Sequence, residues 1–291
     1  MNKRLCLILA FMLIFSLAFS QAEVDLDVFK DGLHAFLDDI NLSLPDSTLS
    51  GVTWSDAYIG QIIGVPPHFG VGLATGISRF RVGGLAKTLE LVGSDLPINE
   101  LVFPTIALEG RIGGFILPFD IGLRFGFLPE VQIKDIGLKY LHYGADIRYA
   151  LLKQNLVLPN ISLALGYYGT SGALSYVFTA AEITGVDIPG VTDKPETLAI
   201  DFQTNVIDGR LQVSKSFLVV TPYAGFGLSY DITNSSYKLI NETDTASEKG
   251  WQYRAFGGLS FNIVVVKIDL SGMYNFKSEN WGANLGLRVQ L

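Results

Sequence analysis

The sequence predicts an all-β fold, an antiparallel transmembrane β-barrel of about 10 strands (range roughly 8–12) with a short N-terminal helical segment as a plug or cap. Three observations predict it. Hydrophobic residues make up 49% of the chain and the mean hydropathy is +0.36, yet no apolar run after residue 22 approaches the ~18 residues of a spanning helix. Segments of about ten residues alternate between apolar and small or polar side chains. The chain also contains 31 glycines and shows little helical periodicity after residue 50.

Residues 1–22 have the pattern of a secretory signal peptide. Lys3 and Arg4 precede an apolar run over 5–19, and small residues at Ser20 and Ala22 indicate cleavage after Ala22. The alternative is an uncleaved membrane anchor. The run of about 15 apolar residues is shorter than the ~20 that a spanning helix needs, which favours the signal peptide.

Removal of this signal changes what the chain can bind. Cys6 is the single cysteine and lies inside the signal, so the mature chain has no disulfide or cysteine-based metal site. Without Lys3 and Arg4, 19 of the 21 basic residues remain against 28 acidic ones. So acidic a chain is not expected to bind nucleic acid.

Residues 23–66 break the β pattern and are predicted to form a plug or hatch. Apolar side chains recur at three- and four-residue spacing over 24–41, which predicts an amphipathic helix that Pro45 and Gly51 end. The plug candidates are Phe29, Leu33, Phe36 and Trp54. The segment could lie in the lumen, at the periplasmic mouth or on the membrane surface. Its acidity disfavours the membrane surface, because anionic headgroups would repel it.

Residues 67–291 are predicted to form the barrel. In 119–128, for example, Phe119, Ile121 and Leu123 face one way while Asp120 and Arg124 face the other, as expected for a strand with a lipid face and a lumen face. Aromatic residues at strand ends, among them Tyr140, Trp251 and Trp281, fit the two membrane interfaces. The ten candidate strands lie near 68–80, 103–113, 119–128, 138–151, 161–176, 196–216, 222–232, 250–263, 266–276 and 281–291.

Connection lengths orient the barrel. Short connections are expected in the periplasm and longer ones outside. The short connections are 114–118, 152–159, 217–221 and 264–265, and the external ones are 81–102, 129–137, 181–195, 233–249 and 277–280.

One strand is ambiguous. Asp208-Gly209 suits a two-residue hairpin turn, which would divide 196–216 and give eleven strands. We favour one long strand with a bulge near Gly209. In this register Ile200 and Phe202 face lipid and Asp201 faces the lumen.

The C-terminal strand supports the same location. In residues 284–291, small or polar side chains alternate with apolar ones up to the last position. The spacing of Asn284, Gly286, Val289 and Leu291 resembles the C-terminal signal of bacterial outer-membrane β-barrel proteins. That signal most often ends in an aromatic residue. The resemblance implies that the protein lies in the bacterial outer membrane, with outer-membrane lipid and the barrel-insertion machinery as partners.

A plug ahead of a barrel also resembles the long-chain fatty-acid transporters of outer membranes. The resemblance covers organisation only, since those barrels are larger and their Asn-Pro-Ala hatch motif does not occur here. It implies a hydrophobic small-molecule solute, and no binding residue is carried over.

Inward charges form the candidate lumen and ligand site. A small barrel must fill or hydrate its interior, and paired charges can do so. Two interpretations remain. The lumen could conduct water or an amphiphile whose carboxylate or phosphate head binds the arginines, or its interior could be closed by salt bridges and conduct nothing. The candidates are Glu109, Arg111, Asp120, Arg124, Asp146, Arg148, Asp201, Arg254 and Arg288, with Lys267 and Asp269 beside them.

An enzyme is not expected, because His34, His68 and His142 lie on different segments and no metal-spaced cluster or cofactor motif occurs. No catalytic residue, metal or cofactor is therefore predicted. We expect passive transport of small or hydrophobic solutes, gated by the plug. The alternative is a non-conducting surface barrel whose loops at 81–102, 181–195 and 233–249 bind an external partner.

Overall fold

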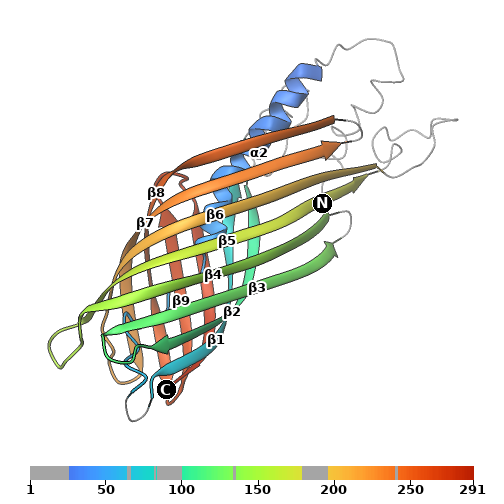
Figure 1. Ribbon diagram of the computed structural model, residues 1–291. Coiled ribbons are helices and arrows are strands. Elements are labelled where there is room, and N and C mark those ends of the chain that lie inside the picture. The colour runs from blue at the N-terminus through green and yellow to red at the C-terminus, as the bar shows by residue number, and fades with distance from the viewer. Residues whose placement is uncertain are drawn as a thin grey trace.

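The computed structural model of the chain is a closed barrel of ten antiparallel strands around one N-terminal helix (Figure 1). It describes residues 26–63, 67–81, 83, 100–133, 136–178, 196–239 and 242–291. The predicted signal peptide and most of the expected loops at 81–102 and 181–195 lie outside the described residues. The elements are α2 (Leu26–Leu49), β1 (Phe69–Arg81), β2 (Glu100–Gly113), β3 (Phe119–Ile133), β4 (Ile136–Leu152), β5 (Asn160–Phe178), β6 (Glu196–Ser214), β7 (Val220–Leu239), β8 (Glu242–Ile263), β9 (Val266–Asn275) and β10 (Trp281–Gln290).

Each strand pairs with its neighbour in the chain, and β10 pairs with β1 to close the sheet. Closure removes the free edges that an open sheet would expose to lipid. Short turns at 114–118, 153–159, 215–219 and 264–265 lie at one end, while β5 to β8 extend well beyond the others at the opposite end (Figure 1). The predicted ten strands and the antiparallel order are confirmed.

The outward face of the barrel is an apolar belt. Side chains such as Leu123, Leu165, Leu228, Leu285 and Leu287 are exposed on it. On the same strands the inward positions hold charged and small residues, which is the inverse of a soluble protein. The closed sheet and this belt make the protein an outer-membrane β-barrel. Among the described residues, no helix has the length and hydropathy of a membrane span.

The predicted register of β6 is wrong. Phe202, Val206 and Asp208 are buried toward the lumen, and Asp201 is exposed on the outer surface, opposite to expectation. The apolar residues turn inward because α2 lies there: Leu49 and Val52 share a buried cluster with Val206 and Tyr168. Because the lumen is filled by α2, apolar side chains on this strand face inward where they would otherwise be expected to face lipid.

The expected bulge at Gly209 is also wrong. β6 is one long strand, as predicted, but it pairs with β5 and β7 without any register shift. The register shifts lie between 128 and 131 in β3 and between 150 and 152 in β4.

Two expected loops prove to be strand. Residues 129–133 and 136–137 continue β3 and β4, and residues 233–239 and 242–249 of the second expected loop are the paired ends of β7 and β8. Polar side chains there keep the two-residue alternation outside the apolar belt.

The helix is longer than predicted and continues through Pro45 to Leu49. A proline removes the hydrogen bond to the carbonyl four residues earlier, so it usually ends a helix. Here the lower part of the helix lies inside the barrel, and the polar side chains from Asn41 to Ser50 are buried. Gly51, with a φ of 71°, then supplies the left-handed turn that ends it.

Candidate functional site: the barrel interior

The N-terminal segment (residues 26–63) runs the whole length of the bore. It begins at the end where β7 and β8 extend and descends toward the short turns (Figure 1). Four contacts mark its path from top to bottom: His34 Nδ1 to Asp244 Oδ2 at 2.7 Å, Ser47 Oγ to Ser78 Oγ at 2.7 Å, Trp54 Nε1 to Glu109 Oε2 at 2.7 Å, and Ile62 N to Gly114 O at 3.1 Å.

The upper part of the bore is apolar. The helix buries one face there, consisting of Leu33, Phe36, Leu37, Ile40 and Leu44. Of the plug candidates, Leu33 and Phe36 lie on this buried face, whereas the side chain of Phe29 is outside the described residues.

Aromatic side chains of the wall line the same region. Phe103 stacks on Phe80 with ring centroids 5.9 Å apart, and it contacts Tyr140 at 5.6 Å and Phe202 at 6.1 Å. Tyr140 is thus an inward residue and not part of the membrane-interface girdle that the sequence indicated.

Buried polar contacts fix the middle of the segment. Asp46 accepts hydrogen bonds from Asn275 Nδ2 at 2.6 Å, Ser278 Oγ at 2.6 Å and Asn280 Nδ2 at 3.0 Å. The Thr48 hydroxyl lies 2.7 Å from that of Thr170. Sequence reasoning missed Asp46, because its partners lie more than 200 positions away in the chain.

Below the helix, side chains of the wall hold the main chain of the segment. Arg210 Nη1 donates to the carbonyl of Val52 at 2.9 Å, and Gln212 Nε2 donates to that of Trp54 at 2.7 Å. Arg148 Nη1 donates to the carbonyl of Asp56 at 2.5 Å. Backbone that has no strand or helix partner is thereby satisfied inside the bore.

The lower bore holds a network of ion pairs. Arg111 pairs with Asp120 at 2.5 Å and with Asp146 at 2.8 Å, and Arg148 pairs with Asp120 at 2.9 Å. Eight of the nine predicted lumen residues are buried in this interior, all except Asp201. The further pairs are Arg124 with Glu109 at 2.7 Å, Arg254 with Asp208 at 2.8 Å, Arg210 with Asp208 at 3.0 Å, and Arg288 with Asp269.

Three important members of this network were missed. Asp56 belongs to the N-terminal segment and pairs with Lys267 Nζ at 2.5 Å and Arg288 Nη2 at 3.1 Å. Asp208 and Arg210 belong to β6, where the alternation of Asp208, Arg210, Gln212 and Ser214 is visible in the sequence. That polar alternation indicates an inward face for these residues, but Asp208-Gly209 also suits a turn, which makes the alternation harder to recognise.

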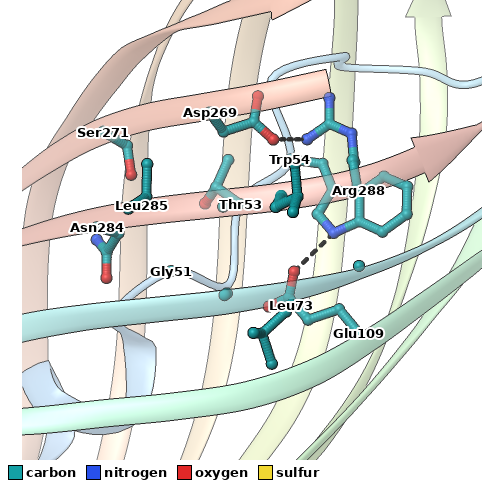
Figure 2. Close-up of a pocket in the computed structure, with 14 residues that line it drawn as sticks. Gly51, Thr53, Trp54, Leu73, Glu109, Asp269, Ser271, Asn284, Leu285 and Arg288 are labelled. Carbon is teal, nitrogen blue, oxygen red and sulfur yellow. Dashed lines mark hydrogen bonds and ion pairs between the residues drawn. The ribbon is translucent and has the colours of Figure 1, made fainter. Parts of the chain in front are cut away.

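Trp54 lies at the centre of the lower bore (Figure 2). Its ring packs against the guanidinium groups of Arg288, 4.7 Å from the ring centroid, and Arg111, at 5.6 Å. Trp54 lines a cavity of about 20 Å³, and a second cavity measures about 10 Å³. Both cavities are lined by Gly51, Thr53, Ser271 and Asn284. Each has room for about one water molecule.

Comparison with known proteins places the barrel in a family. A model for a family of unknown function, DUF6588, matches residues 69–291, which is the barrel from β1 to β10. The chain belongs to the DUF6588 family. The match begins at β1, so the N-terminal segment that fills this DUF6588 barrel precedes the matched region. No curated protein matches the chain.

Solved structures resemble the DUF6588 barrel only distantly. The outer-membrane protease OmpT of Escherichia coli has a TM-score of 0.46 at 11% identity, over 77% of this chain and 97% of that one. The translocator domain of the autotransporter NalP from Neisseria meningitidis has a TM-score of 0.43 at 8% identity, over 91% and 97%. A FadL homologue from Pseudomonas aeruginosa has a TM-score of 0.29 at 8% identity, over 77% and 90%.

Proposed function

We propose that the protein is a gated outer-membrane barrel for passive passage of small or hydrophobic solutes, with the N-terminal segment as its movable plug. The observation that carries the proposal is the way the segment is held. Its lower half contacts the wall through hydrogen bonds from Arg148, Arg210 and Gln212 to main-chain carbonyls. Water can replace such bonds, which contribute a net of about 0.5–1.5 kcal/mol for a neutral donor such as Gln212 and about 1.5–3 kcal/mol for a charged donor such as Arg148 or Arg210.

The lining of the bore supports a hydrophobic solute. With the plug displaced, the upper bore would present Phe80, Phe103, Tyr140 and Phe202, and the lower bore would present its hydrated ion pairs. Such a path offers apolar surface to a solute before it meets charge.

A non-conducting surface barrel is the second candidate. The water-sized cavities and the extensive pairing of charges in the lower bore favour it. In that case the function would lie in the external ends of the strands.

A reversible lock distinguishes the two candidates. Ser47 on the helix and Ser78 on β1 have hydroxyl oxygens 2.7 Å apart, and the mature chain is predicted to contain no cysteine. The double variant Ser47→Cys/Ser78→Cys should form a disulfide that fixes the plug. The single variant Ser47→Cys is the matched control.

The readout is conductance in planar bilayers and solute-driven swelling of liposomes. We expect openings in the reduced double variant and in the control, and none after oxidation. If neither the native protein nor the reduced double variant conducts, gated transport is contradicted. This holds even if a chain lacking residues 23–66 conducts, because the plug would then be a fixed part of the barrel.

A further inference from the structure

The short turns at the periplasmic end expose an unusual ring of apolar side chains. Ile116, Leu156 and Val264 are 83%, 100% and 93% exposed, and Leu218 is fully exposed. These four residues come from the four turns at 114–118, 153–159, 215–219 and 264–265, and we refer to them as the apolar turn ring. Turns that face water are normally built from Gly, Pro, Asn, Asp and Ser.

The β8–β9 turn has hydrophobic residues at positions where turn-forming residues are usual. Val264 adopts a φ of 56°, a conformation that Asn, Asp or Gly takes readily and a β-branched residue rarely does. A second valine, Val265, follows it. No contact within the barrel explains the choice, because the Val264 side chain is almost fully exposed.

The polar backbone of the β4–β5 turn is satisfied by the protein itself. Asn155 Oδ1 accepts hydrogen bonds from the amides of Val157 at 2.9 Å and Leu158 at 2.8 Å. Lys215 Nζ donates to the carbonyls of Asn155 at 2.5 Å, Leu156 at 3.2 Å and Leu158 at 3.0 Å. Asn155 forms an Asx turn of the kind that solvated turns also use, but the three carbonyls bound by Lys215 have a protein donor in place of water, as a turn in contact with lipid requires.

The neighbouring turns are bonded in the same manner. Phe217 and Val220 exchange both of their backbone hydrogen bonds, at 2.8 Å and 3.1 Å. Gln154 bridges the two turns through the amide of Ser216 at 2.7 Å and its carbonyl at 3.3 Å. In the β2–β3 turn, Gln61 Nε2 donates to the carbonyl of Ile116 at 2.5 Å.

The charges at this end fit a phospholipid surface. The chain has 28 acidic and 21 basic residues, yet the four turns contain no acidic residue and two lysines, Lys153 and Lys215. Lysines beside apolar residues are typical of protein that meets anionic headgroups.

The height of the belt places the ring at the inner interface. From Trp251 to Phe261 on β8 there are ten residue steps, and at ~3.3 Å per residue and a tilt of about 40° they span ~25 Å, the height of a barrel's apolar band. Asn262 hydrogen-bonds to the buried Thr221, and the next exposed residues after Phe261 are Ile263 and Val264, so the ring continues the lipid-facing surface.

We propose that the apolar turn ring inserts into the inner leaflet of the outer membrane, with Lys153 and Lys215 at the level of anionic phospholipid headgroups. The ring anchors the periplasmic end of the barrel in lipid and is not a water-facing rim. The occupant is phospholipid; a periplasmic protein covering the ring is the competing outcome of the test.

Single-cysteine variants test the proposal in the full mature chain. Ile116→Cys, Leu156→Cys and Leu218→Cys would carry an environment-sensitive nitrobenzoxadiazole label in vesicles of phosphatidylethanolamine and phosphatidylglycerol. Ser247→Cys, on the exposed polar end of β8, is the matched aqueous control. Heat-modified mobility on gels confirms that each variant is folded.

We expect the three ring labels to emit at shorter wavelength than the control and to be quenched several-fold more by headgroup-proximal doxyl lipids than by iodide on both sides. The Ser247→Cys label should show the reverse. Quenching of the ring labels mainly by iodide would overturn the proposal. Protection from iodide in native outer membranes but not in lipid vesicles would also overturn it, in favour of a periplasmic protein partner.

Discussion

Trp54 of the N-terminal segment and Glu109 of β2 form a direct link between the segment and the barrel wall, with the indole Nε1 donating to the carboxylate at 2.7 Å. Glu109 is at the same time paired with Arg124 at 2.7 Å. The ring of Trp54 also contacts Arg288 and Arg111. One side chain therefore connects the segment to three charged groups of the wall by direct contact and to Arg124 through Glu109.

Replacing Trp54 should weaken plug retention in graded steps. Trp54→Phe keeps an aromatic ring but removes the donor to Glu109, which we expect to cost about 1–3 kcal/mol. Trp54→Ala also leaves a cavity, and buried Trp→Ala changes cost about 3–5 kcal/mol. Open probability in planar bilayers should rise in the order native, Phe, Ala. Equal, unchanged conductance in all three would show that this contact does not hold the plug.

Asp56 should matter far more than Asp201, although sequence analysis favoured the latter. Asp56→Asn removes the carboxylate that pairs with Lys267 and Arg288, and breaking a buried ion pair costs about 3–5 kcal/mol. Arg288 keeps Asp269, which favours the lower end of that range. The exposed Asp201→Asn is the matched control and should change the free energy of unfolding by less than about 0.5 kcal/mol. Denaturant titration of the folded barrel in vesicles measures both values, and equal effects would contradict the observed register of β6.

The contact between His34 and Asp244 should make the upper end of the helix sensitive to pH. The hydrogen bond that His34 Nδ1 donates to the Asp244 carboxylate raises the pKa of His34 above its usual value, and the negative charge of Asp244 acts in the same direction. A raised pKa in the folded state means that the stabilisation is complete below the unfolded pKa of histidine and is lost as pH rises through the folded value.

The size of this effect is limited, because both side chains are more than a third exposed, and we expect less than about 1 kcal/mol at low salt. A spin label on Asp31→Cys should become more mobile between about pH 5.5 and pH 8.5, values that bracket the usual range of histidine. Asp244→Asn should abolish the dependence. A pH response that survives this substitution would point to another titrating group.

The direction of the helix predicts which side of the membrane its first turns face. With the short turns in the periplasm, the end near His34 and Asp244 lies at the external mouth. A membrane-impermeant maleimide added to intact cells should label Asp31→Cys and Ser247→Cys. Lys153→Cys, in a periplasmic turn, should react only after the outer membrane is permeabilised. The reverse pattern would invert the topology.

Much of the barrel could be predicted from the sequence because strand alternation is a local property. Ile121 and Asp120 show their opposite faces without knowledge of any partner strand, and the order of ten strands follows from adjacency along the chain. The inward position of most charged candidates, such as Arg111 and Arg148, followed from the same alternation.

Three of the differences between prediction and structure share one cause. The sequence predicts the wrong face for Asp201 and Tyr140 because apolar side chains are expected to face lipid, and the filled bore offers them a second apolar environment. Pro45 lies within the helix for the same reason, since the surrounding wall maintains a helix that would end there in isolation.

The sequence by itself determined the strands, their number, the lipid-facing belt and the presence of a helical segment before the barrel. Those features depend on periodicity within about ten residues and on side-chain polarity. Only the tertiary structure decided that Asp56 meets Lys267 and Arg288 and that Asp46 meets Asn275. These contacts join residues more than 200 positions apart, and they exist only because the closed sheet surrounds the segment and places opposite walls within hydrogen-bond reach of it.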